Sequence, residues 1–220
     1  MGRRGKRRRQ EKVRMLDIEA WEPKTEIGRL VKSKEVNTIE EIFNRGKPIL
    51  EPEIIDALLP ELEAEILSVS PTQRATDSGR KMSFRVIAVI GDKKGHVGIG
   101  VGKNNEVKPA IDYAMLDARK NIVGVKTGCG SWECKCGALH SIPREAKGKY
   151  GSTEVTLKPA PKGLGLAANS TIKQVLETAG VRDIWSFARG STSNIYNMAM
   201  ATINALDSLN KMKPQPGDKI

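Results

Sequence analysis

The chain has 220 residues, a formal net charge of +11 and only 4% aromatic residues. This length allows one large domain or two small ones, and a basic chain with few aromatics favours a polyanion bound through its phosphates over one bound by base stacking. No apolar run is long enough to span a membrane, the charged N-terminus is not typical of a signal peptide, and three cysteines favour a reducing cytoplasm over a disulfide framework.

The first fourteen residues form a basic arm. They hold eight cationic side chains and one acidic side chain, with too little apolar surface to offset the entropy lost on ordering. We therefore predict that the arm is disordered alone and becomes ordered on a nucleic acid, with a solubilising tail as the alternative. The phosphate-binding residues predicted in the arm are Arg3, Arg4, Lys6, Arg7, Arg8 and Arg9.

The next segment is an extension with scattered apolar residues. Between residues 16 and 50 these predict a chain that lies on a neighbouring surface rather than forming a core of its own. Residues 38–43 predict a short helix, with Thr38 as N-cap and Glu41 completing a capping box. Residues 52–67 have the apolar spacing of an amphipathic helix, which Pro60 should kink or divide.

A strand at about residues 64–69 is followed by a polar stretch. Residues 71–81 predict a loop with three cations and one acid. Arg74, Arg80 and Lys81 are candidate contacts to a polyanion, and an ordinary solvated connection is the alternative.

The chain is organised around a predicted β-hairpin at residues 82–103. Its turn, residues 91–95, has a glycine at each end for a positive φ. In its second strand Gly98, Gly100 and Gly102 share one face, which leaves bare backbone that a large partner can approach. We expect a phosphate backbone there and expect a Cβ at Gly100 to cost little in the isolated fold; the alternative is a packed hairpin whose glycines serve only sheet-on-helix contact. The predicted cations of this hairpin are Lys93, Lys94, His96 and Lys103.

The glycine spacing excludes two nucleotide-binding motifs. The row is Gly-x-Gly-x-Gly, whereas a dinucleotide fingerprint requires Gly-x-Gly-x-x-Gly. A Walker A loop requires Ser or Thr after Gly-Lys, but Asn104 follows Lys103.

A helix over residues 105–123 leads to an irregular segment with a cluster of soft metal ligands. The spacing Cys-x4-Cys-x-Cys-x3-His is atypical of zinc sites, which usually contain Cys-x2-Cys pairs. Two interpretations stay open, a structural zinc site or three free thiols, and catalytic use is not indicated. The candidate ligands are Cys129, Cys134, Cys136 and His140.

The C-terminal part predicts a strand, a loop, two helices and a strand between them. A strand at residues 152–158 precedes a basic loop containing Lys162, and Asn169-Ser170 should begin a helix that stops at Gly180. A helix N-terminus behind such a loop suits an anion, and a plain connection is the alternative. A strand at residues 181–188 and a last helix after residues 191–194 complete the pattern.

Several segments together resemble one family, the universal small-subunit ribosomal protein five (S-five) family. The residues that carry the resemblance are Ser83-Phe84-Arg85, Gly91-Asp92-Lys93-Lys94-Gly95-His96-Val97-Gly98-Ile99-Gly100-Val101-Gly102-Lys103, Leu157-Lys158-Pro159-Ala160-Pro161-Lys162-Gly163-Leu164-Gly165 and Ala179-Gly180-Val181-Arg182-Asp183-Ile184-Trp185. The stretch Gly130-Ser131-Trp132-Glu133 and the cysteine-rich insert resemble the archaeal branch.

The resemblance implies an α+β fold with two small domains. These are a double-stranded-RNA-binding-like α-β-β-β-α domain and a left-handed βαβ domain. The predicted boundaries are a basic arm at 1–15, an extension at 16–60, the first domain at 61–126, the second at 127–213 and a tail at 214–220.

The resemblance also implies a function and partners. It implies a non-catalytic structural protein of the cytoplasmic small ribosomal subunit that binds 16S ribosomal RNA beside small-subunit proteins four and eight. It would stabilise the region where mRNA enters and is decoded, and influence accuracy, with no cofactor required. The loop matching residues 74–81 would reach toward the RNA helix that binds spectinomycin. A stand-alone double-stranded-RNA-binding or RNA-processing module is the alternative; a kinase-like phosphotransferase is excluded by the missing glycine loop and acid pair.

Overall fold

The computed structural model describes residues 10–12, 21–134, 136 and 138–211. It is an α+β fold with two sheets, as predicted, one in the order β1-β2-β3-β4-β5 and one in the order β6-β7-β9-β8. The elements up to the first sheet's last strand are β1 (Gln10–Lys12), α1 (Glu26–Lys32), α2 (Ile39–Arg45), α3 (Glu53–Leu58), β2 (Glu63–Thr76), β3 (Gly79–Gly91), β4 (His96–Asn104), α4 (Val107–Lys120) and β5 (Ile122–Gly124). The remaining elements are β6 (Ala146–Tyr150), β7 (Thr153–Pro159), β8 (Leu166–Ala167), α5 (Ser170–Ala179), β9 (Ile184–Gly190) and α6 (Ile195–Asn210).

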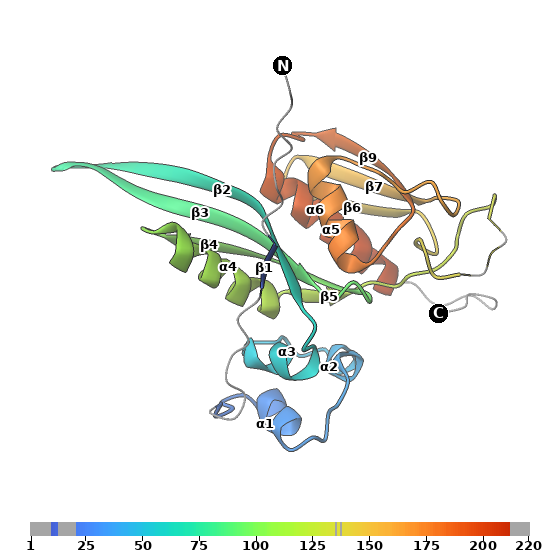
Figure 1. The fold of residues 1–220 in the computed structure, drawn as a ribbon, viewed down its shortest axis with the longest axis horizontal. Helices are drawn as coiled ribbons and strands as arrows, with labels where there is room; N and C mark the ends of the chain where they lie inside the picture. The colour runs from blue at the N-terminus through green and yellow to red at the C-terminus, as the bar shows by residue number, and fades with distance from the viewer. Residues whose placement is uncertain (1–9, 13–20, 135, 137, 212–220) are drawn as a thin grey trace.

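A long two-stranded ribbon replaces the loop predicted at residues 71–81. Strands β2 and β3 stay in antiparallel register out to the pair Thr76–Gly79, with a bulge between Ile66 and Ser68. The ribbon projects from one end of the molecule (Figure 1). The ribbon could not be predicted from the sequence, because both faces of its outer part are exposed to solvent. The alternation of apolar and polar residues that marks a half-buried strand is therefore missing.

Helix α4 covers one face of the first sheet and lies directly on the glycine row of β4. A Cβ at Gly98, Gly100 or Gly102 would lie closer than 3.0 Å to backbone atoms of α4. The alternative interpretation of this row is therefore the correct one: the large partner is the chain's own helix. The expectation that a phosphate backbone occupies this face, and that a Cβ at Gly100 costs little, is wrong.

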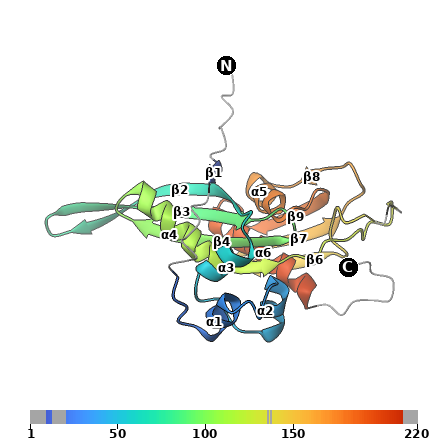
Figure 2. The same ribbon diagram turned by 60° about the horizontal axis from the view of Figure 1, so that its bottom comes forward.

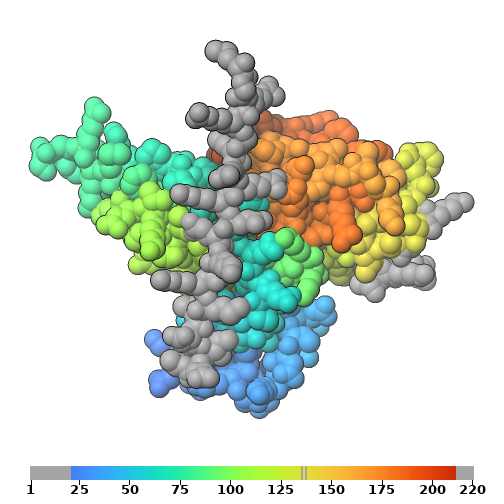
Figure 3. Space-filling model, viewed as in Figure 1, coloured from blue at the N-terminus to red at the C-terminus, as the bar shows by residue number. Residues whose placement is uncertain are grey.

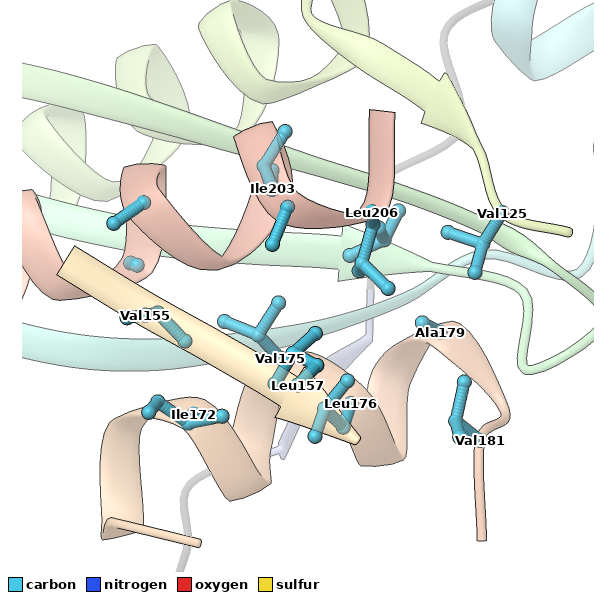
Figure 4. Packing of buried hydrophobic residues seen from close by; sticks show 14 of the residues in the cluster. Val125, Val155, Leu157, Ile172, Val175, Leu176, Ala179, Val181, Ile203 and Leu206 are labelled. Carbon is cyan, nitrogen blue, oxygen red and sulfur yellow. The ribbon is translucent and has the colours of Figure 1, made fainter. Parts of the chain in front are cut away.

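The opposite face of the first sheet shares a core with the second half of the chain. Ile87, Val89, Val97 and Ile99 of the first sheet belong to the same buried cluster as residues of β7, α5 and α6. Figure 4 shows side chains from the second half interleaving in this cluster, and Figure 2 shows both layers from below. The two halves therefore stabilise each other through one continuous apolar core.

The N-terminal helices form a core of their own, contrary to the prediction for residues 16–50. Their buried side chains include Trp21, Ile27, Ile42 and Ile54, and Ile122 of β5 joins them. Pro60 does end the apolar helix pattern, since α3 stops at Leu58 and β2 follows. Thr38 is the N-cap of α2, but its side chain makes no capping hydrogen bond, so the predicted capping box is not formed.

The C-terminal elements follow their sequence signals closely. Gly180 ends α5 in the left-handed region with φ 86°, and the Asn194 side chain accepts from the Asn197 N–H at the start of α6. Strands β8 and β9 are parallel and flank α5, which makes the predicted βαβ unit. Within the described residues no helix has the length and apolar character needed to cross a membrane.

Candidate nucleic-acid interface and metal site

The outer ribbon presents cations that have no ion-pair partner among the described residues. Five residue pairs extend beyond the last pairing of β3 with β4, from Thr72–Ser83 to Thr76–Gly79, a reach of about 17 Å at ~3.3 Å per residue. Figure 3 shows this end standing clear of the rest of the molecule. Arg74 lies directly opposite Lys81. Like charges in that position repel, and no acid pairs with either side chain among the described residues. An anion between the two cations would remove that repulsion.

The cations of the turn between β3 and β4 are less available to an external anion than those of the ribbon. The Lys93 and Lys94 ammonium groups each lie 2.5 Å from a carboxylate, of Glu63 and Glu61 respectively. The Lys93 N–H donates to the Thr178 carbonyl at the end of α5, 3.0 Å away. This turn is therefore docked against the second half of the chain, and its charges are partly neutralised.

Asp92 organises the same turn. Its Oδ1 accepts from the backbone N–H groups of Lys94 and His96, and its Oδ2 lies 2.6 Å from His96 Nδ1. Burial raises the pKa of Asp92, but the hydrogen bonds from the His96 side chain and from these N–H groups outweigh it and lower the pKa. His96 therefore has a structural partner within the turn. The residues of the turn with a positive φ are Lys93 and Gly95, whereas the prediction had placed it at Gly91 and Gly95.

The other predicted cations lie apart from one another. Lys103 lies near the base of the ribbon, opposite Arg85 of β3, and its side chain is exposed. Lys162 is exposed on the loop between β7 and β8. The arm residues 3–9 lie outside the described residues, although Gln10–Lys12 pairs with the edge of β2.

The cysteine cluster is brought together by the fold. One ligand atom from each of Cys129, Cys134, Cys136 and His140 lies within 4.8 Å of the others. The Cys136 and Cys129 sulfurs are 3.6 Å apart, and Cys134 Sγ is 3.7 Å from His140 Nε2. In a tetrahedral zinc site with Zn–S of ~2.3 Å and Zn–N of ~2.0 Å, such ligand pairs are about 3.5–3.8 Å apart. These two distances between ligand atoms therefore match those of a tetrahedral zinc site.

The pKa values of Cys129 and Cys134 are shifted in opposite directions. Hydrogen bonds from the Cys136 side chain and from the Lys162 backbone lower the pKa of Cys134 to about 6. Burial, followed by the hydrogen bonds with Cys136 and Cys134, raises the pKa of Cys129 to about 11. A thiolate raises the pKa of a neighbouring thiol because like charges repel. A bound divalent cation lowers the pKa of every thiol that coordinates it, because it attracts each thiolate.

Asp183 holds the histidine, and the sequence patterns did not single it out. Its Oδ2 lies 2.8 Å from His140 Nδ1, and both groups are buried. A carboxylate at Nδ1 keeps the proton there, which directs the lone pair of Nε2 toward the cysteines. Only its place in the segment 179–185 hinted at a role, because its partner is 43 residues away in the chain.

Comparison with known proteins places both halves in one family. Residues 62–126 match the family model of the ribosomal protein S5 N-terminal domain, and residues 148–216 match that of the S5 C-terminal domain. The chain is 53% identical over 194 residues to small ribosomal subunit protein uS5 of Methanocaldococcus jannaschii, covering 88% of this chain and 89% of the relative. The chain belongs to the ribosomal protein S5 family.

Further relatives of the S5 family are also archaeal. The uS5 proteins of Aeropyrum pernix and Methanothermobacter thermautotrophicus are each 50% identical, over 90% and 92% of this chain and 90% and 94% of the relative. The family and branch predicted from the sequence are thus confirmed. The relatives are named as ribosomal proteins rather than enzymes, in agreement with a non-catalytic chain. The cysteine cluster falls between the two matched segments.

Proposed function

We propose that this S5-family chain is a structural constituent of the archaeal small ribosomal subunit, located in the cytoplasm. The observation that supports this most is that both S5 domains match in order within a chain about half identical to archaeal uS5 proteins over most of its length. We propose the predicted domain limits with it: arm 1–15, extension 16–60, first domain 61–126, second domain 127–213 and tail 214–220. Its partners are 16S ribosomal RNA and neighbouring proteins, among them small-subunit proteins four and eight.

The proposed RNA contacts position the protein rather than read bases. The outer ribbon, with Arg74, Arg80 and Lys81, is the strongest candidate because its cations are exposed and unpaired among the described residues. Phosphate contacts fix register without sequence information. In this proposal the protein stabilises the RNA where mRNA enters and is decoded, and it influences accuracy. The remaining proposed contacts are Arg3, Arg4, Lys6, Arg7, Arg8, Arg9, Lys93, Lys94, His96, Lys103 and Lys162.

Sedimentation tests the assignment against a stand-alone RNA-binding module. We expect the native protein in a cell extract to travel with the small subunit through a sucrose gradient at moderate salt. A stand-alone double-stranded-RNA-binding protein would stay near the top of the gradient. Release of the chain at low salt, with intact subunits below it, would contradict the proposal.

The ribbon contact is tested by removing the facing cations. Arg74→Ala with Lys81→Ala should weaken binding of the full chain to 16S RNA and flatten the slope of log K against log salt by about two units, one for each lost phosphate contact. The comparison variant is Lys93→Ala with Lys94→Ala, two proposed contacts whose ammonium groups already face Glu63 and Glu61. We expect a smaller change in slope for this pair. Equal slopes for all three proteins would remove the ribbon from the interface.

The arm is tested in the same assay. Residues 2–14 carry eight cations, and if about five of them reach phosphates, deleting the segment should flatten the salt slope by about four units. A deletion that binds with the slope of the full chain would show that the arm is only a solubilising tail.

We also propose that the cysteine cluster binds zinc in a structural role. The support is that three sulfurs and one imidazole nitrogen converge, with two separations near those of a tetrahedron. Four protein ligands leave no open position for a water or substrate, which fits a structural site and not a catalytic one. Elemental analysis of the full chain purified without chelator should find about one zinc per chain, whereas three titratable thiols without zinc would leave the cluster as free cysteines.

A further inference from the structure

We propose that Asp183 is the positioning residue of the zinc site and that bound zinc fixes the loop at residues 162–165. This proposal rests on the zinc site proposed above. It concerns how the metal is held and what its binding does to the surface of the protein.

Asp183 joins the metal ligand to the loop through its two carboxylate oxygens. Oδ2 faces His140 Nδ1 at 2.8 Å, while Oδ1 accepts from the N–H groups of Gly163 at 3.1 Å and Gly165 at 2.8 Å. The carboxylate is buried, with 5% of the residue exposed. One side chain therefore orients the imidazole and holds two backbone amides of the loop.

A second connection to the loop runs through the backbone beside Asp183. The Ile184 N–H donates to the Gly165 carbonyl at 3.2 Å. Asp183 and the residue after it therefore hold the loop by three hydrogen bonds.

The ligand segment is itself anchored to Asp183. The His140 carbonyl accepts from the Arg182 and Asp183 N–H groups, and Ser141 Oγ donates to the Asp183 carbonyl at 2.5 Å. His140 and Asp183 therefore cannot separate without breaking several buried hydrogen bonds. This rigidity fixes the position of Nε2 for coordination.

The consequence appears at the surface. Lys162 and Leu164 are exposed on the loop, and the exposed fraction of Leu164 is 44%. Without zinc, the cysteines have only weak sulfur contacts and no ligand bond holds Nε2 of His140, so the connection from the imidazole through Asp183 to the Gly163 and Gly165 amides is less firmly fixed. With zinc, the loop has one conformation in which Lys162 is displayed to a polyanion. The metal would thus pre-order a phosphate-contacting loop and lower the entropy lost on binding.

The isosteric variant Asp183→Asn separates metal binding from folding. To keep accepting from Gly163 and Gly165, the new amide must place its oxygen on them, so its NH2 group faces His140 Nδ1. The imidazole must then carry its proton on Nε2, which removes the lone pair required for zinc. We expect a folded protein whose zinc affinity is 10–100-fold lower.

Zinc affinity is measured on the full chain by competition with a chromophoric chelator, and Co²⁺ is used as a spectroscopic probe of thiolate coordination. Asp77→Asn, at the exposed ribbon turn, is the control and should bind zinc as the unaltered chain does. Hydrogen–deuterium exchange of the peptide spanning residues 161–166 should be faster in the metal-free chain than in the zinc-loaded chain, while exchange of α6 stays unchanged.

The outcomes distinguish the two proposals. No zinc or Co²⁺ binding by the unaltered chain would overturn the zinc site itself. Normal zinc binding by Asp183→Asn would overturn the positioning role of Asp183. Tight zinc binding with unchanged exchange at residues 161–166 would overturn the coupling to the loop and leave the zinc site standing.

Discussion

Gly100→Ala should destabilise the full chain by about 3 kcal/mol or more, at the upper end of the range for overpacking a tight contact. The added Cβ would lie closer than 3.0 Å to the Ala114 carbonyl oxygen and to the N and Cα atoms of Ala118. Backbone atoms of a helix cannot move aside as a flexible side chain can, so α4 must shift away from β4. The change in the free energy of unfolding is measured by urea denaturation followed by circular dichroism.

The control adds the same methyl group elsewhere in the same sheet. A Cβ at Gly124 in β5 would meet only the ring of Phe43, at 3.3 Å, and a ring can rotate or slide. Gly124→Ala should therefore change the free energy of unfolding by less than about 1 kcal/mol. If Gly100→Ala were as stable as this control, the close packing of α4 on β4 would be wrong.

Close packing of a helix backbone on strand glycines also occurs on the second sheet. On the second sheet, a Cβ at Gly148 of β6 would lie closer than 3.0 Å to backbone atoms of Ala201 and Ala205 in α6. In both places small residues on a helix lie over glycine on a strand. This pairing lets the helix backbone approach the sheet more closely than branched side chains allow. The glycine row is thus part of the core, although its sequence pattern resembles an exposed backbone surface.

The sequence predicted best where the signal is local. The ends of α5 and α6 were predicted because Gly180 and Asn194 act through their own backbone or side chain. The face of β4 that carries glycines was also predicted, but a helix as its partner was only the alternative to RNA. An empty strand face is compatible with RNA or with a helix, and only the tertiary arrangement chooses between them.

The ribbon and the cysteine cluster show why the rest of the site was harder to predict. Neighbouring ribbon residues such as Gln73 and Arg74 point to opposite faces and are both exposed, so no burial period marks them as strand. The four candidate metal ligands were predicted because they form the one local cluster of soft ligands in this sequence. Asp183 was not, because its hydrogen bond to His140 joins residues 43 positions apart.

A buried ion pair joins the N-terminal helices to the first sheet's helix. Asp56 of α3 and Arg119 of α4 are each 3% exposed, and Arg119 Nε donates to Asp56 Oδ1 at 2.8 Å. Burying two charges is costly, and their mutual attraction offsets that cost only while both remain in place. The pair lies beside the apolar cluster of the N-terminal helices, which also includes Ile122. We expect it to fix how these helices dock.

Asp56→Leu should therefore destabilise the chain by about 3 kcal/mol, because the Arg119 guanidinium loses this buried carboxylate. Asp56→Leu combined with Arg119→Met should lose less than the sum of the two single variants, since the charge that faced the missing partner is removed as well. Urea denaturation of Asp56→Leu, of Arg119→Met and of the double variant gives the coupling energy directly. Limited proteolysis should cut the segment of α1 to α3 faster in the single variants than in the double variant. Additive single effects, with no coupling energy, would mean that the pair is incidental and that apolar packing alone docks the N-terminal helices.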